Sequence, residues 1–166
     1  MSDIFISYSQ NDRDRVKRLV DAFSAEGYDV WWDLNIRAGE SFDERIEGML
    51  EKVSCVVGVW SNTSVNSEWV RAESGWAKDR DIFVSVRIDN EARLPLKFYY
   101  VHTANLTGWN GARDSAEFRS VLKDVEVLTG SPTPATGAER SPSVRIRAAH
   151  ATAPAGIASS ASNRIT

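Results

Sequence analysis

A single glutamate stands between two tryptophans near the middle of the chain, at a spacing that could carry chemistry. Trp69, Glu73 and Trp76 lie at i, i+4 and i+7, and Ala72 and Ala77 complete one stripe along a helix. A carboxylate on a stripe that faces the core is costly unless something binds it, so Glu73 is a candidate functional residue. The alternative is a helix rotated so that Glu73 points to water and both tryptophans are half-buried.

The elements that must position Glu73 alternate between strand-like and helix-like patterns. Apolar runs predict five strands, at residues 3–8, 28–33, 53–60, 81–88 and 99–104. Apolar residues at helical spacing predict helices that begin at Asn11 or Asp12, at the Ser41 and Glu44 capping box, in the Glu73 segment, and at Asp114 with Glu117. Because strands joined by helical crossovers pair in parallel, we expect an α/β fold.

Three further features refine this prediction. Gly27 is expected to end the first helix as a C′ residue. Residues 34–40 have no hydrophobic period and contain Gly39, which predicts a loop. The last helix should turn five apolar side chains inward, namely Phe118, Val121, Leu122, Val125 and Leu128.

The third predicted strand, at residues 53–60, is apolar on both faces, as a central strand covered by helices must be. In open parallel sheets, ligands bind beyond the carboxyl ends of the strands. We therefore expect one rim to contain residues 8–10, 33–41 and 61–64 together with the first turns of the Glu73 helix.

Composition indicates one folded domain in a reducing compartment. The chain has 166 residues, 42% of them hydrophobic, which is enough for one core of normal size. Its only cysteine, Cys55, lies in an apolar run, so an internal disulfide is excluded and a buried core position is expected. The N-terminus lacks a signal-peptide pattern and no run of 18 apolar residues occurs, so a soluble, cytoplasmic protein without membrane contact is expected.

Charge and composition separate the chain into two parts. Residues 131–166 hold four arginines and one glutamate, a net charge of +3, which leaves −6 on residues 1–130 from the total of −3. An acidic body without a basic stripe argues against a nucleic-acid partner. Residues 131–166 are rich in Ser, Ala, Thr, Pro and Gly and contain no aromatic residue, so we predict a domain at 1–130 and a disordered tail or linker at 131–166.

Several familiar nucleotide and metal sites are missing from the sequence. Neither the P-loop nor the GxGxxG pattern occurs. A receiver domain would need acidic residues where Ser7 and Ser61 stand, and the segment after the first strand has no glycine for a flavin phosphate loop. His102 and His150 are far apart and lack neighbouring ligands, so no metal site is predicted.

Four stretches together resemble a Toll/interleukin-1 receptor (TIR) domain of the bacterial kind. They are Ile4-Phe5-Ile6-Ser7-Tyr8-Ser9, Val30-Trp31-Trp32-Asp33 with residues 36–42 after it, residues 61–73, and Leu106-Thr107-Gly108-Trp109. The resemblance covers about residues 1–130. It implies a flavodoxin-like five-stranded parallel sheet in the order 2-1-3-4-5, with helices on both faces.

The resemblance also implies either NAD⁺ cleavage or self-association as a signalling scaffold. In NAD⁺-cleaving members, a glutamate on the helix after the third strand is essential and a tryptophan stands one turn before it. Glu73 and Trp69 match these positions. Positions that help line the family's cleft are matched by Tyr8, Ser9, Gly39 and Phe42. Gln10 stands where the family often has a basic residue, so a phosphate contact there is not expected.

The residue types suit this chemistry. Cleavage of the bond between ribose and nicotinamide builds positive charge on the ribose, which one carboxylate can stabilise. NAD⁺ would be the substrate, with no cofactor, and the products would be nicotinamide and ADP-ribose or a cyclised isomer. The alternatives are a nucleoside deoxyribosyltransferase-like enzyme and a non-catalytic homotypic scaffold.

The expected partners follow from the same resemblance. Self-association would use the loop from Leu34 to Ser41, and other TIR domains or a fused or partner sensor could participate. A role in signalling, immunity or antiviral defence is the setting that such a system implies.

Overall fold

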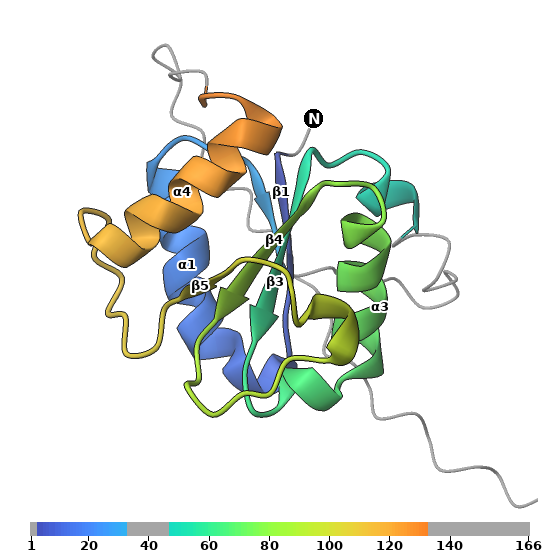
Figure 1. The fold of residues 1–166 in the computed structure, drawn as a ribbon. Coiled ribbons are helices and arrows are strands. Elements are labelled where there is room, and N and C mark those ends of the chain that lie inside the picture. The colour runs from blue at the N-terminus through green and yellow to red at the C-terminus, as the bar shows by residue number, and fades with distance from the viewer. Residues whose placement is uncertain (1–2, 33–46, 133–166) are drawn as a thin grey trace, which may run out of the picture.

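Five parallel strands form one sheet in the order β2-β1-β3-β4-β5 (Figure 1). The computed structural model describes residues 3–32 and 47–132. The strands in it are β1 (Ile4–Ser7), β2 (Val30–Trp31), β3 (Cys55–Trp60), β4 (Phe83–Arg87) and β5 (Thr103–Asn105). This topology confirms the predicted flavodoxin-like α/β fold.

Helices cover both faces of the sheet. Helices α1 (Arg13–Ala25) and α4 (Ala116–Thr129) lie on one face and α3 (Glu68–Lys78) lies on the other (Figure 1). Three short 3₁₀ helices, η1 (Gln10–Asp12), η2 (Ser64–Asn66) and η3 (Leu96–Phe98), follow β1, β3 and β4. Residues 47–50 are also helical. The start of that helix at Ser41, predicted from the capping box, lies outside the described residues.

The side chains of β1 alternate between the two cores. Ile4 and Ile6 belong to the cluster beneath α1 and α4, whereas Phe5 belongs to the cluster beneath α3. This alternation is the usual period of two along a strand. Ser7 therefore points toward α3.

Strand β3 is buried along its whole length, which confirms the prediction of a central strand. Cys55 begins it, and burial raises the pKa of its thiol to about 12, as expected for a core cysteine. Gly58 allows α3 to approach, because a Cβ atom there would lie 2.7 Å from the Ser74 Oγ and 2.5 Å from the Phe83 ring. Since Ser7 pairs with Gly58 in the sheet, this close approach brings α3 near the end of β1.

Two predicted boundaries differ from the structure. The segment expected to begin the fifth strand is a turn after η3, and the side chains of Tyr99 and Tyr100 are exposed there, so β5 starts only at Thr103. The last helix is capped by Ser115, whose Oγ accepts a hydrogen bond from the Phe118 amide at 3.2 Å, and not by Asp114. The first helix ends at Ala25, and Gly27 follows the C-cap Glu26 as the predicted C′ residue, with a positive φ of 99°.

Helix α3 is rotated relative to the predicted stripe. Its buried residues are Val70, Glu73, Ser74, Gly75 and Ala77. Ala72 is exposed, and Trp69 and Trp76 are only partly buried. The predicted stripe was therefore centred about one residue away from the face that packs against the sheet. Glu73 and Ala77 belong both to the predicted stripe and to the buried face. Ser67 caps the helix by accepting a hydrogen bond from the Val70 amide at 3.4 Å.

Candidate functional site

Glu73 is buried against the end of β1. The residue is only 3% exposed, and its Oε2 accepts a hydrogen bond of 2.5 Å from the Ser7 hydroxyl. The alternative prediction, in which α3 is rotated so that Glu73 points to water, is therefore wrong. A hydroxyl that donates to a carboxylate offsets part of the cost of burying the charge and fixes the orientation of the group.

Trp69 lies one turn before Glu73 on the same helix. Its side chain is partly buried and packs against the apolar cluster of Phe5, Trp31, Met49, Leu50, Val53, Val56 and Ala77. This placement puts an indole at the edge of the core on the Glu73 side of the sheet. An indole in such a place can offer a face for stacking while the rest of the ring anchors the helix.

Tyr8 and Ser9 follow β1 but differ in their surroundings. The Tyr8 ring is buried in the cluster beneath α1 and α4, with its centroid 5.8 Å from that of Trp32. Ser7 and Tyr8 therefore direct their side chains to opposite faces of the sheet. Ser9 is partly exposed, and its carbonyl accepts a hydrogen bond from the Asp12 amide at 2.8 Å, which starts η1.

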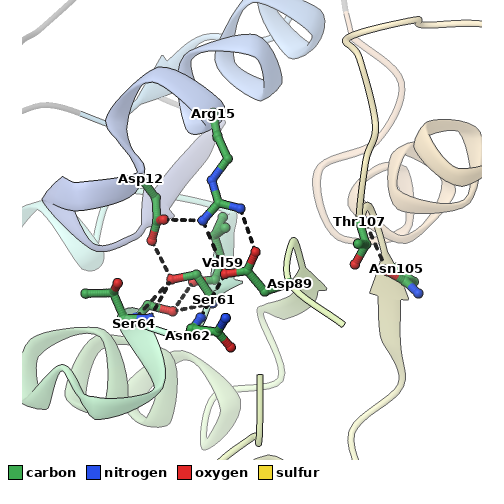
Figure 2. Close-up of polar contacts among 10 residues, drawn as sticks. Asp12, Arg15, Val59, Ser61, Asn62, Ser64, Asp89, Asn105 and Thr107 are labelled. Atoms are coloured by element: carbon green, nitrogen blue, oxygen red, sulfur yellow. Dashed lines mark hydrogen bonds and ion pairs between the residues drawn. The ribbon is translucent and has the colours of Figure 1, made fainter. Parts of the chain in front are cut away.

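A polar network ties together the loops that follow β1, β3 and β4 (Figure 2). Asp12, only 2% exposed, accepts hydrogen bonds of 2.5 Å from both the Ser61 hydroxyl and the Arg15 guanidinium. The same guanidinium donates to Asp89 at 2.7 Å and 3.2 Å. Asp89 also accepts from the Asn62 amide at 2.9 Å. One arginine thus holds two carboxylates from separate segments of the rim.

The network continues into the turn after β3. The Ser61 Oγ accepts hydrogen bonds from the amides of Thr63 and Ser64, at 3.2 Å and 3.0 Å. The Ser64 hydroxyl donates to the Val59 carbonyl at 2.7 Å. Hydrogen bonding to Arg15 holds the pKa of Asp89 below its ordinary value, and the bond to Asp89 raises the pKa of Arg15. Both groups therefore stay charged near neutral pH.

The sequence profile of the family described as TIR domain matches residues 4–122, which contain β1, the rim network and Glu73. The chain belongs to the TIR domain family. A comparison with curated proteins finds no match.

Two of the predicted site residues of this TIR domain, Gly39 and Phe42, lie outside the described residues, as does the loop from Leu34 to Ser41. Within the described ranges, the structure brings Glu73 and Ser7 into contact and places Trp69 on the same side of the sheet. It places the Tyr8 ring on the other side. The described part of the chain also contains no group of three or more His, Cys, Asp or Glu side chains that could hold a metal ion, and none of its helices could cross a membrane.

Sequence reasoning missed Ser7 and Asp12 as members of the rim. Ser7 interrupts an otherwise apolar strand, and a hydroxyl that replaces an apolar residue at the end of a buried strand could have indicated a polar partner on the covering helix. Asp12 was interpreted as a possible helix cap. Its side chain forms no cap hydrogen bond and binds Arg15 and Ser61 instead.

Proposed function

We propose that this TIR domain cleaves NAD⁺ to nicotinamide and ADP-ribose or a cyclised isomer, with Glu73 as the catalytic residue. The observation that supports the proposal most is the buried contact between the Glu73 carboxylate and the Ser7 hydroxyl, at the end of β1 in a TIR domain. A carboxylate there is held in one orientation. An oriented charge stabilises a developing cation better than a mobile one, because little reorganisation is needed as the reaction proceeds.

In the proposed reaction, the bond between ribose C1′ and the nicotinamide nitrogen breaks and its electron pair leaves with nicotinamide, which becomes neutral. Positive charge then develops on C1′ and the ring oxygen, where Glu73 stabilises it. Water adds to C1′ and releases a proton, giving ADP-ribose. When a ring nitrogen or hydroxyl of the same nucleotide adds instead, the product is a cyclised isomer. No protonation of nicotinamide is needed, so one carboxylate suffices.

Each neighbouring residue has a proposed role in this reaction. Ser7 positions Glu73 through its hydroxyl, and Trp69 provides an aromatic wall beside the substrate. Ser9, Gly39 and Phe42 are proposed to border the substrate, and the buried Tyr8 is proposed to support the site from the core. NAD⁺ is the substrate, and the reaction uses no further cofactor.

The direct test is incubation of the full chain with NAD⁺, followed by chromatographic separation of nicotinamide, ADP-ribose and its isomers. Release of nicotinamide in proportion to enzyme and time supports the proposal. A parallel incubation with a deoxynucleoside distinguishes a deoxyribosyltransferase-like enzyme, which would release the free base instead. Absence of nicotinamide release at both low and high protein concentration would contradict NAD⁺ cleavage.

Homotypic association is the second candidate function, and the family match favours it because TIR domains generally interact with other TIR domains. We propose that the loop from Leu34 to Ser41 makes this contact and that the setting is a signalling or defence system in the cytoplasm. Specific activity that rises with protein concentration would link association to catalysis. Stable self-association without nicotinamide release would instead favour the scaffold.

A further inference from the structure

A cavity of about 560 Å³ lies between the end of β4 and the start of β5, away from the Glu73 site. Its lining residues are Arg87, Ala92, Arg93, Leu94, Leu96, Tyr99, Val101 and Thr103. Strand β3 separates β4 from β1, whose end contacts Glu73, so the two places are distinct. The volume lies in the range of sites that bind small molecules.

The charge of this cavity is unusual for an acidic domain. Two arginines, Arg87 and Arg93, are among its lining residues, which include no carboxylate. In the described part of the chain, no ion pair or hydrogen bond engages the Arg87 side chain, and its Nε is fully buried without a hydrogen-bond partner. A buried donor that lacks a protein partner is a group that a ligand can satisfy.

The walls of the cavity are held in place by packing and hydrogen bonds. Phe98 packs against Trp60 with ring centroids 4.8 Å apart, which anchors the segment that carries Leu96 and Tyr99. The Thr103 hydroxyl bonds to Ser85 at 2.8 Å and to the Val101 carbonyl at 3.1 Å. The cavity is therefore largely preformed, which lowers the entropic cost of binding.

The apolar residues of the lining indicate which kind of ligand body would fit the cavity. Leu96 and Tyr99 are 90% and 69% exposed, so their apolar surfaces are accessible at the mouth of the cavity. A flat ring could stack on the Tyr99 phenol, and the leucines and Val101 would contact its edge. Two arginines from separate segments match a group that carries almost two negative charges, as a phosphate monoester does, and can bind it through paired hydrogen bonds.

We propose that this cavity binds an aromatic phosphate monoester of the size of a nucleoside monophosphate. The phosphate would lie between Arg87 and Arg93, and the ring would lie against Tyr99. The proposal does not depend on NAD⁺ cleavage, because it uses none of the residues assigned to that reaction.

The experiment is calorimetric titration of the full chain with AMP, adenosine and inorganic phosphate. AMP should bind at one site, at least ~10-fold more tightly than adenosine, which lacks the charge, or phosphate, which lacks the ring. Arg87→Gln should weaken AMP binding by ~10-fold or more. Arg71→Gln, which removes an exposed arginine on α3 outside the cavity, should leave it unchanged. Equal affinities for AMP and adenosine, or no binding of AMP, would overturn the proposal.

Because AMP is also part of NAD⁺, the location of its binding site must be determined separately. Backbone amide NMR shifts should change around Arg87, Arg93 and residues 99–103, both in the wild type and in Glu73→Gln. Arg93→Gln, which alters an exposed loop residue, provides a second variant if Arg87→Gln does not fold. Shifts confined to the surroundings of Ser7 and Glu73 would assign AMP to the other site and overturn the proposal.

Discussion

Two buried carboxylates lie on the rim of this TIR domain, and their surroundings differ. Asp12 is 2% exposed and Glu73 is 3% exposed. Asp12 shares the Arg15 guanidinium with Asp89 and accepts a hydrogen bond from Ser61, so it joins three loops. Glu73 lies in the middle of α3 and accepts a hydrogen bond from the hydroxyl of Ser7.

Burial alone therefore does not identify a functional carboxylate. Asp12 accepts a hydrogen bond from Ser61 in a distant segment and shares Arg15 with Asp89, and such contacts hold loops in place. Glu73 instead lies on a rigid element whose close approach to the sheet, at Gly58, already fixes its position. We therefore expect Asp12 to contribute mainly to stability and Glu73 mainly to turnover, and the following variants test this division.

The largest effect is expected from Glu73→Gln. The amide retains the shape of the side chain and an oxygen for the Ser7 hydroxyl, but it removes the negative charge that stabilises the ribosyl cation. NAD⁺ cleavage should fall at least ~100-fold, the scale for loss of one electrostatic contact in a transition state. Nicotinamide release by chromatography measures the rate, and thermal unfolding verifies the fold. A folded variant that retains more than half of the wild-type rate would remove Glu73 from the catalytic role.

Asp12→Asn should instead lower stability more than turnover. It leaves Arg15 with one charged partner in place of two. It also replaces the carboxylate that accepts a hydrogen bond from the Ser61 hydroxyl with a neutral amide. The free energy of unfolding should fall by ~1–3 kcal/mol, less than for a fully buried ion pair, because the Arg15 side chain is 42% exposed. Denaturant unfolding measures the change.

The matched control for Asp12→Asn is Asp21→Asn, which breaks an exposed pair with Lys17 on α1. We expect this change to cost less than ~0.5 kcal/mol. If the two variants unfolded at the same denaturant concentration, Asp12 would not brace the rim. If Asp12→Asn lowered turnover as much as Glu73→Gln, the proposed division between the two carboxylates would be wrong.

Ser7→Ala tests whether the hydroxyl positions Glu73. Without it, the carboxylate loses a charge-assisted hydrogen bond and its fixed orientation, so kcat should fall by ~10-fold with a smaller change in KM. Ser7→Thr, which keeps a hydroxyl, should restore most of the rate.

The control for Ser7→Ala is Ser74→Ala. Ser74 follows Glu73 on α3, is fully buried, and its hydroxyl has no hydrogen-bond partner in the part of the chain that the structure describes. Its removal should leave kcat unchanged. Equal losses in the two variants would indicate that any buried hydroxyl at this helix matters and that Ser7 has no specific positioning role.

The resemblance to TIR domains implied the order of the strands and a functional Glu73, whereas the local spacing around Glu73 left open a helix rotated to turn it to water. The apolar residues of β3 indicate a central strand, and the positive φ of Gly27 follows from its place after a helix. The predicted boundaries of strands and helices were less accurate. Tyr99 and Tyr100 have strand-like side chains, but the tight turn after η3 leaves them exposed.

Contacts between distant segments could not be predicted in the same way. Ser7 and Glu73 are 66 residues apart, and Arg15 and Asp89 are 74 residues apart. Nothing in the local spacing indicates either pair, because each depends on which loops the sheet order places side by side. The rotation of α3 was also missed, since Ala72 fits an apolar stripe and Ser74 does not, yet Ser74 packs opposite Gly58.

The smallest effect is expected from Asp89→Asn, and it depends on pH. The hydrogen bond from Arg15 lowers the pKa of Asp89 in the folded protein, so the unfolded chain binds a proton at this carboxyl more readily. The contribution of Asp89 to stability is therefore present above its ordinary pKa, near 3.8, and is lost as the pH falls through the lower pKa of the folded state. At about pH 7 the variant should be less stable by up to ~1 kcal/mol, since the pair is partly exposed. Melting temperatures of both proteins at about pH 7, 5 and 3 should show a gap that persists to about pH 5 and narrows toward pH 3. A gap of constant size would mean that the Asp89 charge does not support the rim, and that Arg15 braces it through Asp12 alone.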